Sequence, residues 1–410
     1  MTNSTDATGG NVRPFSIHIP DERLAEVRER VEKTWWPSEP KFTGDDPWYY
    51  GADLATMKDL ARFWLDEYDW REHEAHINSF PQFMVGVGDG QEIHTVHVRS
   101  GGLPVLVLHG WPNSFHTYLD LVGPMTDPAA HGAPEAAPFD VILPSLPGYA
   151  FSPCDRILSP REVASMMQRL MTELGYDRYI VVGGDWGAHI ASLMGHDFPE
   201  NVIAIHIDHS EVRHAGSNIG TGQTGADDAT AAEVDFIERE TELWGREGAY
   251  CHQQLTRPQS LAFAMTDSPV GAAAWLVEKW YAWADVDPET FLQVFSPDRL
   301  LTEVLVYILP DRFVTATWLY TGCGDAVLTE LNPGERVEVP VSVSAFPDPA
   351  FPVPPREFIE RSHNVVRYTH ISHGGHYPGI EAPEEYVADI REFVAELSRS
   401  SAHRLSEAIG

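Results

Sequence analysis

Short strand-like runs alternate with helical or loop segments through most of the chain, and this alternation predicts its architecture. Most of these runs are apolar and β-branched, as expected for strands that are buried on both faces of a sheet. They are PVLVL at 104–108, FDVIL at 139–143, YIVV at 179–182, NVIAI at 201–205, VEVPVSV at 337–343 and NVVRYTHI at 364–371. Strands that are separated by helices form mostly parallel sheets, so we expect an α/β fold with flanking helices.

Two other segments interrupt this alternation. The stretch FMVGVGDGQEIHTVHVRS, at 83–100, predicts a hairpin that turns at Gly88-Asp89-Gly90. Between about Glu211 and Asn332 the chain is first rich in Gly and Thr and then helical. A helical insertion therefore separates the sixth and seventh sheet-like segments. It lies near the open ends of the strands, where it can act as a lid over a binding site.

Helical sequence also flanks the sheet at both ends of the chain. Residues 13–83 are rich in tryptophan, with charged residues at alternate positions, which predicts amphipathic helices packed on a larger unit. The last helix, at 384–398, carries Val387, Ile390, Val394 and Leu397 on one face. The predicted units are a polar lead-in at 1–12, the helical segment at 13–83, the core at 84–210 and 336–400, the lid at 211–335 and a tail at 401–410.

Composition narrows the range of partners. The formal net charge of −33 repels phosphate backbones and anionic lipids, so we expect neither nucleic acid nor a membrane as a partner. No apolar run is long enough to cross a bilayer, and the first residues lack a signal-peptide pattern. Three widely spaced cysteines, Cys154, Cys251 and Cys323, do not make a disulfide framework, so the cytoplasm is the expected location.

The motif GGDWG, at 183–187, follows the run YIVV directly. A strand, a glycine-flanked turn and a helix together form a nucleophile elbow, a strained turn that exposes one side chain above the sheet. Asp185 occupies the place that serine usually takes. A carboxylate with a pKa of about 4 is ionised at neutral pH, and its attack on an sp3 carbon gives an ester that water can cleave. The motif predicts this chemistry on epoxides or halides; the other interpretation is a turn aspartate that caps the next helix.

The second step of such a reaction needs oxyanion donors and a base. HGWP, at 109–112, follows the run PVLVL, so the backbone N–H groups of Trp111 and Trp186 are the expected donors. His376 lies in HGGHYPG, after the last strand and before the last helix, and is the candidate base for water. We expect structural roles for the side chains of His109 and His373. The sequence shows no ligand spacing typical of a zinc site.

Taken together, these motifs resemble those of the microsomal-type epoxide hydrolases, within the α/β-hydrolase superfamily. The shared segments span nearly the whole chain and include HGWP, LPGYAFS, GGDWG, QLTRPQSLAFAMTDSPVGAAAWLVEKW, VSAFP and GGH. The resemblance implies an α/β-hydrolase fold with a helical lid between strands 6 and 7, and it identifies residues 13–83 as the N-terminal meander of that family. It also implies two lid tyrosines that bind and protonate the epoxide oxygen, and these match Tyr250 and Tyr320.

The acid that orients His376 is the point where the chain departs from the family pattern. The family places Asp or Glu second after the Phe-Pro of SAFP, but here that residue is Pro349 and Asp348 comes one residue earlier. A local shift of this proline-rich loop would bring Asp348 to the histidine. Asp208, which follows the run NVIAI, is the alternative acid, and either carboxylate would hold the imidazole tautomer.

We therefore expect an epoxide hydrolase that converts a small-molecule epoxide, aromatic or natural-product-like, into a vicinal diol without a cofactor or a metal. Two alternatives are a haloalkane dehalogenase-like hydrolase, and a ligand-binding relative that has lost catalysis. The sequence leaves a homodimer open.

Overall fold

The computed structural model describes residues 11–41, 44, 46–209, 225–323, 331–332 and 334–400. Most of the predicted lead-in, the predicted tail and the first part of the predicted lid, up to residue 224, lie outside these residues.

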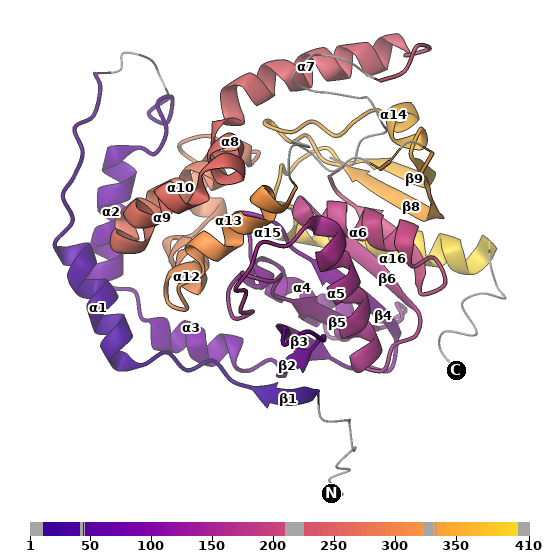
Figure 1. Cartoon of the computed structure of the whole chain (residues 1–410), viewed down its shortest axis with the longest axis horizontal. Helices are drawn as coiled ribbons and strands as arrows, with labels where there is room; N and C mark the ends of the chain where they lie inside the picture. Colours follow the sequence, from indigo (N-terminus) through magenta and orange to yellow (C-terminus); the bar gives the residue numbers. More distant parts are fainter. Residues whose placement is uncertain are drawn as a thin grey trace, which may run out of the picture.

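Nine strands of the described chain form one sheet, in the order β1-β2-β3-β5-β4-β6-β7-β8-β9 (Figure 1). They are β1 (Val12–Phe15), β2 (Gln82–Gly86), β3 (Glu92–Val98), β4 (Leu103–Leu108), β5 (Phe139–Pro144), β6 (Tyr179–Gly183), β7 (Val202–Ile207), β8 (Val337–Ala345) and β9 (His363–His370). β1, β2, β3 and β5 pair antiparallel in that order, and the remaining pairings are parallel. Both the mostly parallel sheet and the hairpin of β2 and β3, which pairs Val85 with Ile93, are confirmed.

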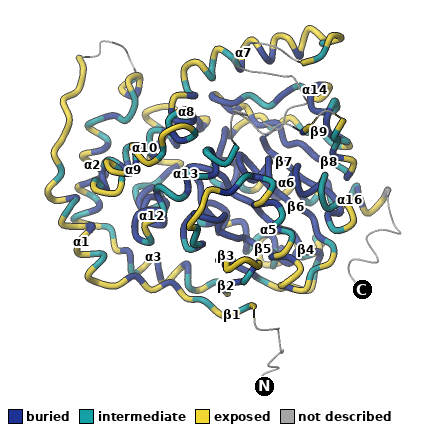
Figure 2. Tube along the Cα trace, in the orientation of Figure 1, coloured by how far each residue is buried: buried dark blue, intermediate teal, exposed yellow. Residues whose placement is uncertain are grey.

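The central strands are apolar because helices cover the sheet. β4, β5, β6 and β7 are buried along their whole length, and Figure 2 shows the sheet as the buried centre of the molecule. The helices of the core are η1 (Phe115–Tyr118), α4 (Leu119–Thr126), α5 (Pro160–Glu173), α6 (Trp186–Asp197), α14 (Arg356–Glu360), α15 (Pro378–Glu381) and α16 (Pro383–Ser400). α5 packs beside α6, and α16 packs beside α4. The predicted apolar face of α16 is buried at Val387, Ile390 and Leu397.

The helical lid follows β7 and precedes β8, the sixth and seventh strands when counting begins at β2. Its described helices are α7 (Ala231–Glu247), α8 (Ala249–Thr256), α9 (Pro258–Asp267), α10 (Pro269–Trp283), α11 (Phe291–Val294), α12 (Pro297–Ile308) and α13 (Phe313–Gly322). Proline opens α9, α10 and α12, because its fixed φ and missing N–H cost nothing in a first helical turn. Among the described helices, none is both long and apolar enough to cross a membrane.

The N-terminal segment contains less helix than the sequence predicts. Residues 12–15 form β1 at the edge of the sheet, and the helices are α1 (Asp21–Glu32), α2 (Leu54–Asp66) and α3 (Trp70–Ile77). An edge strand tolerates Pro14, which has no N–H to donate. The described residues between α1 and α2 form no helix, and prolines at 37, 40 and 47 disfavour one there. The prediction of helix throughout 13–83 is therefore wrong in these two stretches.

This N-terminal segment contacts the lid directly. α1 and α2 pack against α10, and α2 also packs against α12 (Figure 1). The segment thus supports the lid from outside while β1 joins it to the sheet.

Candidate active site

Asp185 lies in the sharp turn between β6 and α6. Its backbone has φ 50° and ψ −128°, a conformation that non-glycine residues rarely adopt and that often marks functional turns. Glycines allow the close approaches around it. A Cβ atom on Gly187 would lie 2.1 Å from the carbonyl oxygen of Leu108, and one on Gly110 would lie 2.0 Å from Oδ1 of Asp185. The GGDWG motif thus places a buried carboxylate at the carboxyl end of a central strand.

The two oxygens of the Asp185 carboxylate have different surroundings. Oδ1 accepts hydrogen bonds from the backbone N–H of Trp111 at 2.8 Å and from that of Trp186 at 2.7 Å. Oδ2 lies 3.4 Å from Nε2 of His376. The expected oxyanion donors therefore hold one oxygen, and the other faces His376.

His376 lies between two carboxylates. Its Nδ1 is 2.7 Å from Oδ2 of Asp348, and its Nε2 faces Asp185. The other oxygen of Asp348 accepts the backbone N–H groups of Ala350 and Phe351, each at 2.8 Å. Burial by itself lowers the pKa of His376, but the charges and hydrogen bonds of the two aspartates outweigh it and raise the pKa well above its ordinary value. The resting site therefore favours an imidazolium.

Asp348, and not Asp208, contacts the imidazole. The loop after β8 presents the residue directly after Phe-Pro to His376, which is the local shift that the sequence required. Asp208 lies at the end of β7 against the elbow, where a Cβ atom on Gly184 would be 2.3 Å from its Oδ1. Burial raises the pKa of Asp208 to about 6. The geometry favours Asp348 as the acid.

His209 is a neighbour of this pair that the sequence analysis missed. Its ring lies 5.2 Å from that of His376, and one of its nitrogens lies within 4.8 Å of a carboxylate oxygen of Asp348 and of a ring nitrogen of His376. Its position directly after Asp208, at the end of a central strand, is a signal that could have identified it.

Both lid tyrosines pack on the tryptophans whose N–H groups hold Asp185. Tyr250, on α8, stacks on Trp111 with ring centroids 5.0 Å apart and an interplanar angle of 8°. Tyr320, on α13, meets Trp186 edge to face at 4.8 Å. The two phenol rings are 5.9 Å apart, and the Tyr320 hydroxyl is buried without a hydrogen-bond partner among the described residues. Such a buried donor is available to a ligand oxygen.

A glutamate of the lid binds the chain just beyond Trp111, and the sequence analysis missed this contact. Glu303, on α12, is 1% exposed. Its carboxylate accepts hydrogen bonds from Ser114 Oγ at 2.8 Å, Thr117 Oγ1 at 2.9 Å and His116 Nδ1 at 3.0 Å. One buried charge on the lid therefore holds three donors of the core.

Two further lid side chains bind Asn113. The indole Nε1 of Trp280 donates to its side-chain oxygen at 3.3 Å, and the Tyr307 hydroxyl donates to its backbone carbonyl. Since Asn113 is two residues from Trp111, these contacts hold the chain next to the backbone N–H that Trp111 donates to Asp185.

Replacing Glu303 by alanine is expected to lower the free energy of unfolding by about 3 kcal/mol, because three donors lose a charged acceptor. Denaturant unfolding followed by tryptophan fluorescence measures this loss. Glu303→Gln keeps an acceptor oxygen and should lose less. An unchanged unfolding midpoint in the alanine variant would contradict this account of the contact.

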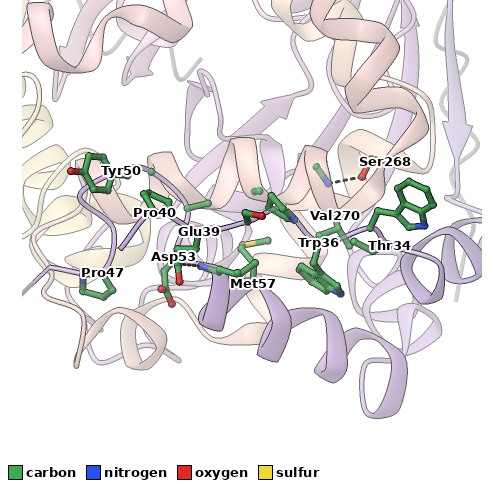
Figure 3. Close-up of a pocket in the computed structure, with 18 of the residues that line it drawn as sticks. Thr34, Trp36, Glu39, Pro40, Pro47, Tyr50, Asp53, Met57, Ser268 and Val270 are labelled. Carbon is green, nitrogen blue, oxygen red and sulfur yellow. Dashed lines mark hydrogen bonds between the residues drawn. The ribbon is translucent and has the colours of Figure 1, made fainter. Parts of the chain in front are cut away.

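A hollow of about 540 Å³ lies apart from these residues, between the segment at 34–54 and the start of α10. Figure 3 shows Trp36, Met57 and Val270 along its lining. No residue of the elbow contributes to it. We therefore place no step of the chemistry there.

Comparisons with known proteins identify the family of the chain. A Stigmatella aurantiaca protein assigned to the epoxide hydrolases is 33% identical to this chain, over 94% of the chain and 85% of the relative. The chain belongs to the epoxide hydrolase family. A family model for the epoxide hydrolase N terminus matches residues 12–118, and one for the alpha/beta hydrolase fold matches residues 104–306.

Solved structures of the epoxide hydrolase family extend this agreement to the fold. The Aspergillus niger epoxide hydrolase has a TM-score of 0.79 at 28% identity, with 95% of this chain and 97% of that one covered. The juvenile hormone epoxide hydrolase of Bombyx mori has a TM-score of 0.83 at 25% identity, with 97% of each chain covered. Epoxide hydrolase 1 of Sus scrofa is 29% identical over 95% of this chain and 90% of its own length. The resemblance stated from the sequence motifs is confirmed.

Proposed function

We propose that the protein opens an epoxide to a vicinal diol through a covalent ester on Asp185. One observation carries the proposal: one oxygen of Asp185 is held by two backbone N–H groups, whereas the other faces His376. In this arrangement the carboxylate supplies the nucleophile, and the ester it forms already lies in its own oxyanion hole.

In the first step, Oδ2 of Asp185 attacks a ring carbon from the side opposite the ring oxygen, and the bond between that carbon and the oxygen breaks. The alkoxide that leaves is strongly basic, so ring opening needs hydrogen-bond donors and a proton. Tyr250 and Tyr320 supply them from the lid. Their burial on Trp111 and Trp186 supports this role, because donors that are shielded from water interact more strongly with a developing charge.

The first step changes the charge next to His376, and this change prepares the second step. Forming the ester neutralises Asp185 and removes one of the two negative charges that face His376. We propose that the pKa of His376 then falls, so that the imidazole can take a proton from water while Asp348 holds its tautomer. The water adds to the ester carbonyl, and Oδ2 leaves with the diol.

A single turnover in oxygen-18 water tests this route. With enzyme in excess over styrene oxide, the label should enter the carboxyl group of Asp185, because water attacks the enzyme's own carbonyl carbon. Mass spectrometry of the peptide that contains GGDWG measures it. Label found only in the diol would refute the covalent route, since water would then have attacked the epoxide directly.

One observation favours dehalogenation as a second candidate function. The indole N–H groups of Trp111 and Trp283 are buried without hydrogen-bond partners among the described residues, and their rings are 6.0 Å apart. Such donors can stabilise a leaving halide. Incubation with styrene oxide and with 1-bromobutane separates the two functions: diol formation supports the first, and bromide release supports the second.

The aromatic walls of the site favour an aromatic or natural-product-like epoxide as substrate. Trp111, Tyr250, Trp283 and Tyr320 present mostly apolar surface, with a few polar atoms, next to the nucleophile. We also propose a cytoplasmic location, from the spacing of the cysteines. Sedimentation would measure whether the protein forms a homodimer.

A further inference from the structure

Lys279 places a positive charge against one of the lid tyrosines. It lies on α10 and is 8% exposed. Its Nζ is 5.3 Å from the ring centroid of Tyr250 and 5.7 Å from that of Trp283. Glu278 binds the ammonium at 2.8 Å, and Glu247 lies 3.7 Å away. Lysines this buried are rare unless they are paired, and here both carboxylates and aromatic rings stabilise the charge.

The second lid tyrosine has a different environment. The ring of Tyr320 meets Trp186, Trp111 and Tyr250 edge to face. In the part of the chain that the structure describes, no ammonium or guanidinium lies over it. Burial raises the pKa of Tyr320 well above its ordinary value, and the nearby Asp185 charge raises it further. Tyr320 is therefore suited to donate a hydrogen bond but poorly suited to lose its proton.

We propose that Lys279 makes Tyr250 the residue that protonates the ring-opened oxygen, with Tyr320 restricted to hydrogen bonding. The inference rests on the proposed function, because it assigns a proton within that reaction. When the epoxide C–O bond breaks, its electron pair stays on the leaving oxygen, which takes the proton of Tyr250. The phenolate that remains is stabilised by the ammonium beside its ring, because opposite charges attract strongly in a buried site. Lys279 is thus a positioning residue that acts through Tyr250.

The remaining proton transfers balance this step. Once Asp185 is esterified, the imidazolium of His376 gives up its proton, which restores the phenol of Tyr250. The neutral imidazole then takes the first proton of the hydrolytic water and passes it to the oxygen that leaves with the diol. The second proton of that water is released when the regenerated Asp185 carboxyl ionises, and it returns His376 to the imidazolium.

The carboxylates that bind Lys279 weaken this stabilisation. Burial raises the pKa of Glu278. The ammonium, however, is the charged group that lies over the ring of Tyr250. It is therefore placed to offset part of the charge of a Tyr250 phenolate.

Removing the charge tests the proposal. Lys279→Met keeps a long side chain without the ammonium, and its rate constant for ester formation, measured by rapid quench, should fall about 10- to 100-fold. Ester hydrolysis should stay within about twofold, because it does not use this proton. Lys279→Arg keeps a cation beside the ring and should restore ester formation to within about fivefold of wild type.

Two double variants test whether Lys279 acts through Tyr250 or only packs against it. In a Tyr250→Phe protein, Lys279→Met should not slow ester formation further, because the proton donor is already absent. In a Tyr320→Phe protein, it should slow ester formation by the same factor as in the wild type. Equal losses in both backgrounds, or equal losses in ester formation and hydrolysis, would overturn the proposal.

The single tyrosine variants keep the proposal testable if the Lys279 variants do not fold. Tyr250→Phe should slow ester formation at least about tenfold more than Tyr320→Phe. The opposite order would overturn the role of Lys279. A wild-type protein that forms no ester with any epoxide would instead refute the proposed function.

Discussion

Replacing Asp185 by asparagine is expected to abolish diol formation, with kcat/KM lowered at least about ten-thousandfold. The amide is neutral and a poor nucleophile, so no ester forms. Its oxygen can still accept the N–H groups of Trp111 and Trp186, which should preserve the elbow. Chromatography of the diol from styrene oxide measures the loss, and a thermal melt checks the fold.

A matched control uses the same substitution on the surface. Asp66→Asn, at the exposed end of α2, should keep wild-type activity. If Asp185→Asn retained more than about a tenth of wild-type activity, with its identity verified by mass, the carboxylate could not be the nucleophile.

Replacing His376 by glutamine is expected to stop the reaction after its first step. Asp185 would still attack the epoxide, but no base would activate water, so turnover should fall by about a thousandfold or more while the ester accumulates. Intact-protein mass spectrometry should show one equivalent of added substrate, and digestion should place it on the GGDWG peptide.

His373→Gln is the matched control for this experiment. His373 precedes His376 by three residues, its side chain is half exposed, and its contact in the structure is with Glu385 at 3.5 Å. The His373→Gln protein should turn over substrate at the wild-type rate and accumulate no ester. An unmodified His376→Gln protein that still produced diol at the wild-type rate would remove this histidine from the mechanism.

The sheet and the elbow could be predicted from the sequence because their determinants are local. The β-branched runs specify buried strands wherever they lie, and the glycines around Asp185 mark a turn that tolerates little else. The lid could be located for the same reason, since a helical pattern interrupts the strands. Helix was overpredicted at the N-terminus because the prediction followed the amphipathic composition and gave too little weight to the prolines, which disfavour helix.

Contacts between distant segments could not be predicted in this way. Ser114 and Glu303 are separated by 189 positions, and nothing local to either residue indicates the other. The choice between Asp348 and Asp208 depended on the path of a proline-rich loop, which tertiary packing determines. Lys279 could have been noticed, since it and Glu278 are the two charged residues of the otherwise apolar stretch AAAWLVEKWYAWA, and a lysine there needs a partner.

The support that α1 and α2 give to the lid limits how substrate can reach Asp185. Swinging the whole lid away would break the packing of α10 against the N-terminal helices and detach Glu303 from Ser114 and Thr117. We therefore expect entry and exit to rely on small local openings rather than on a hinge. Substrates would then be selected by size before any reactive group meets them.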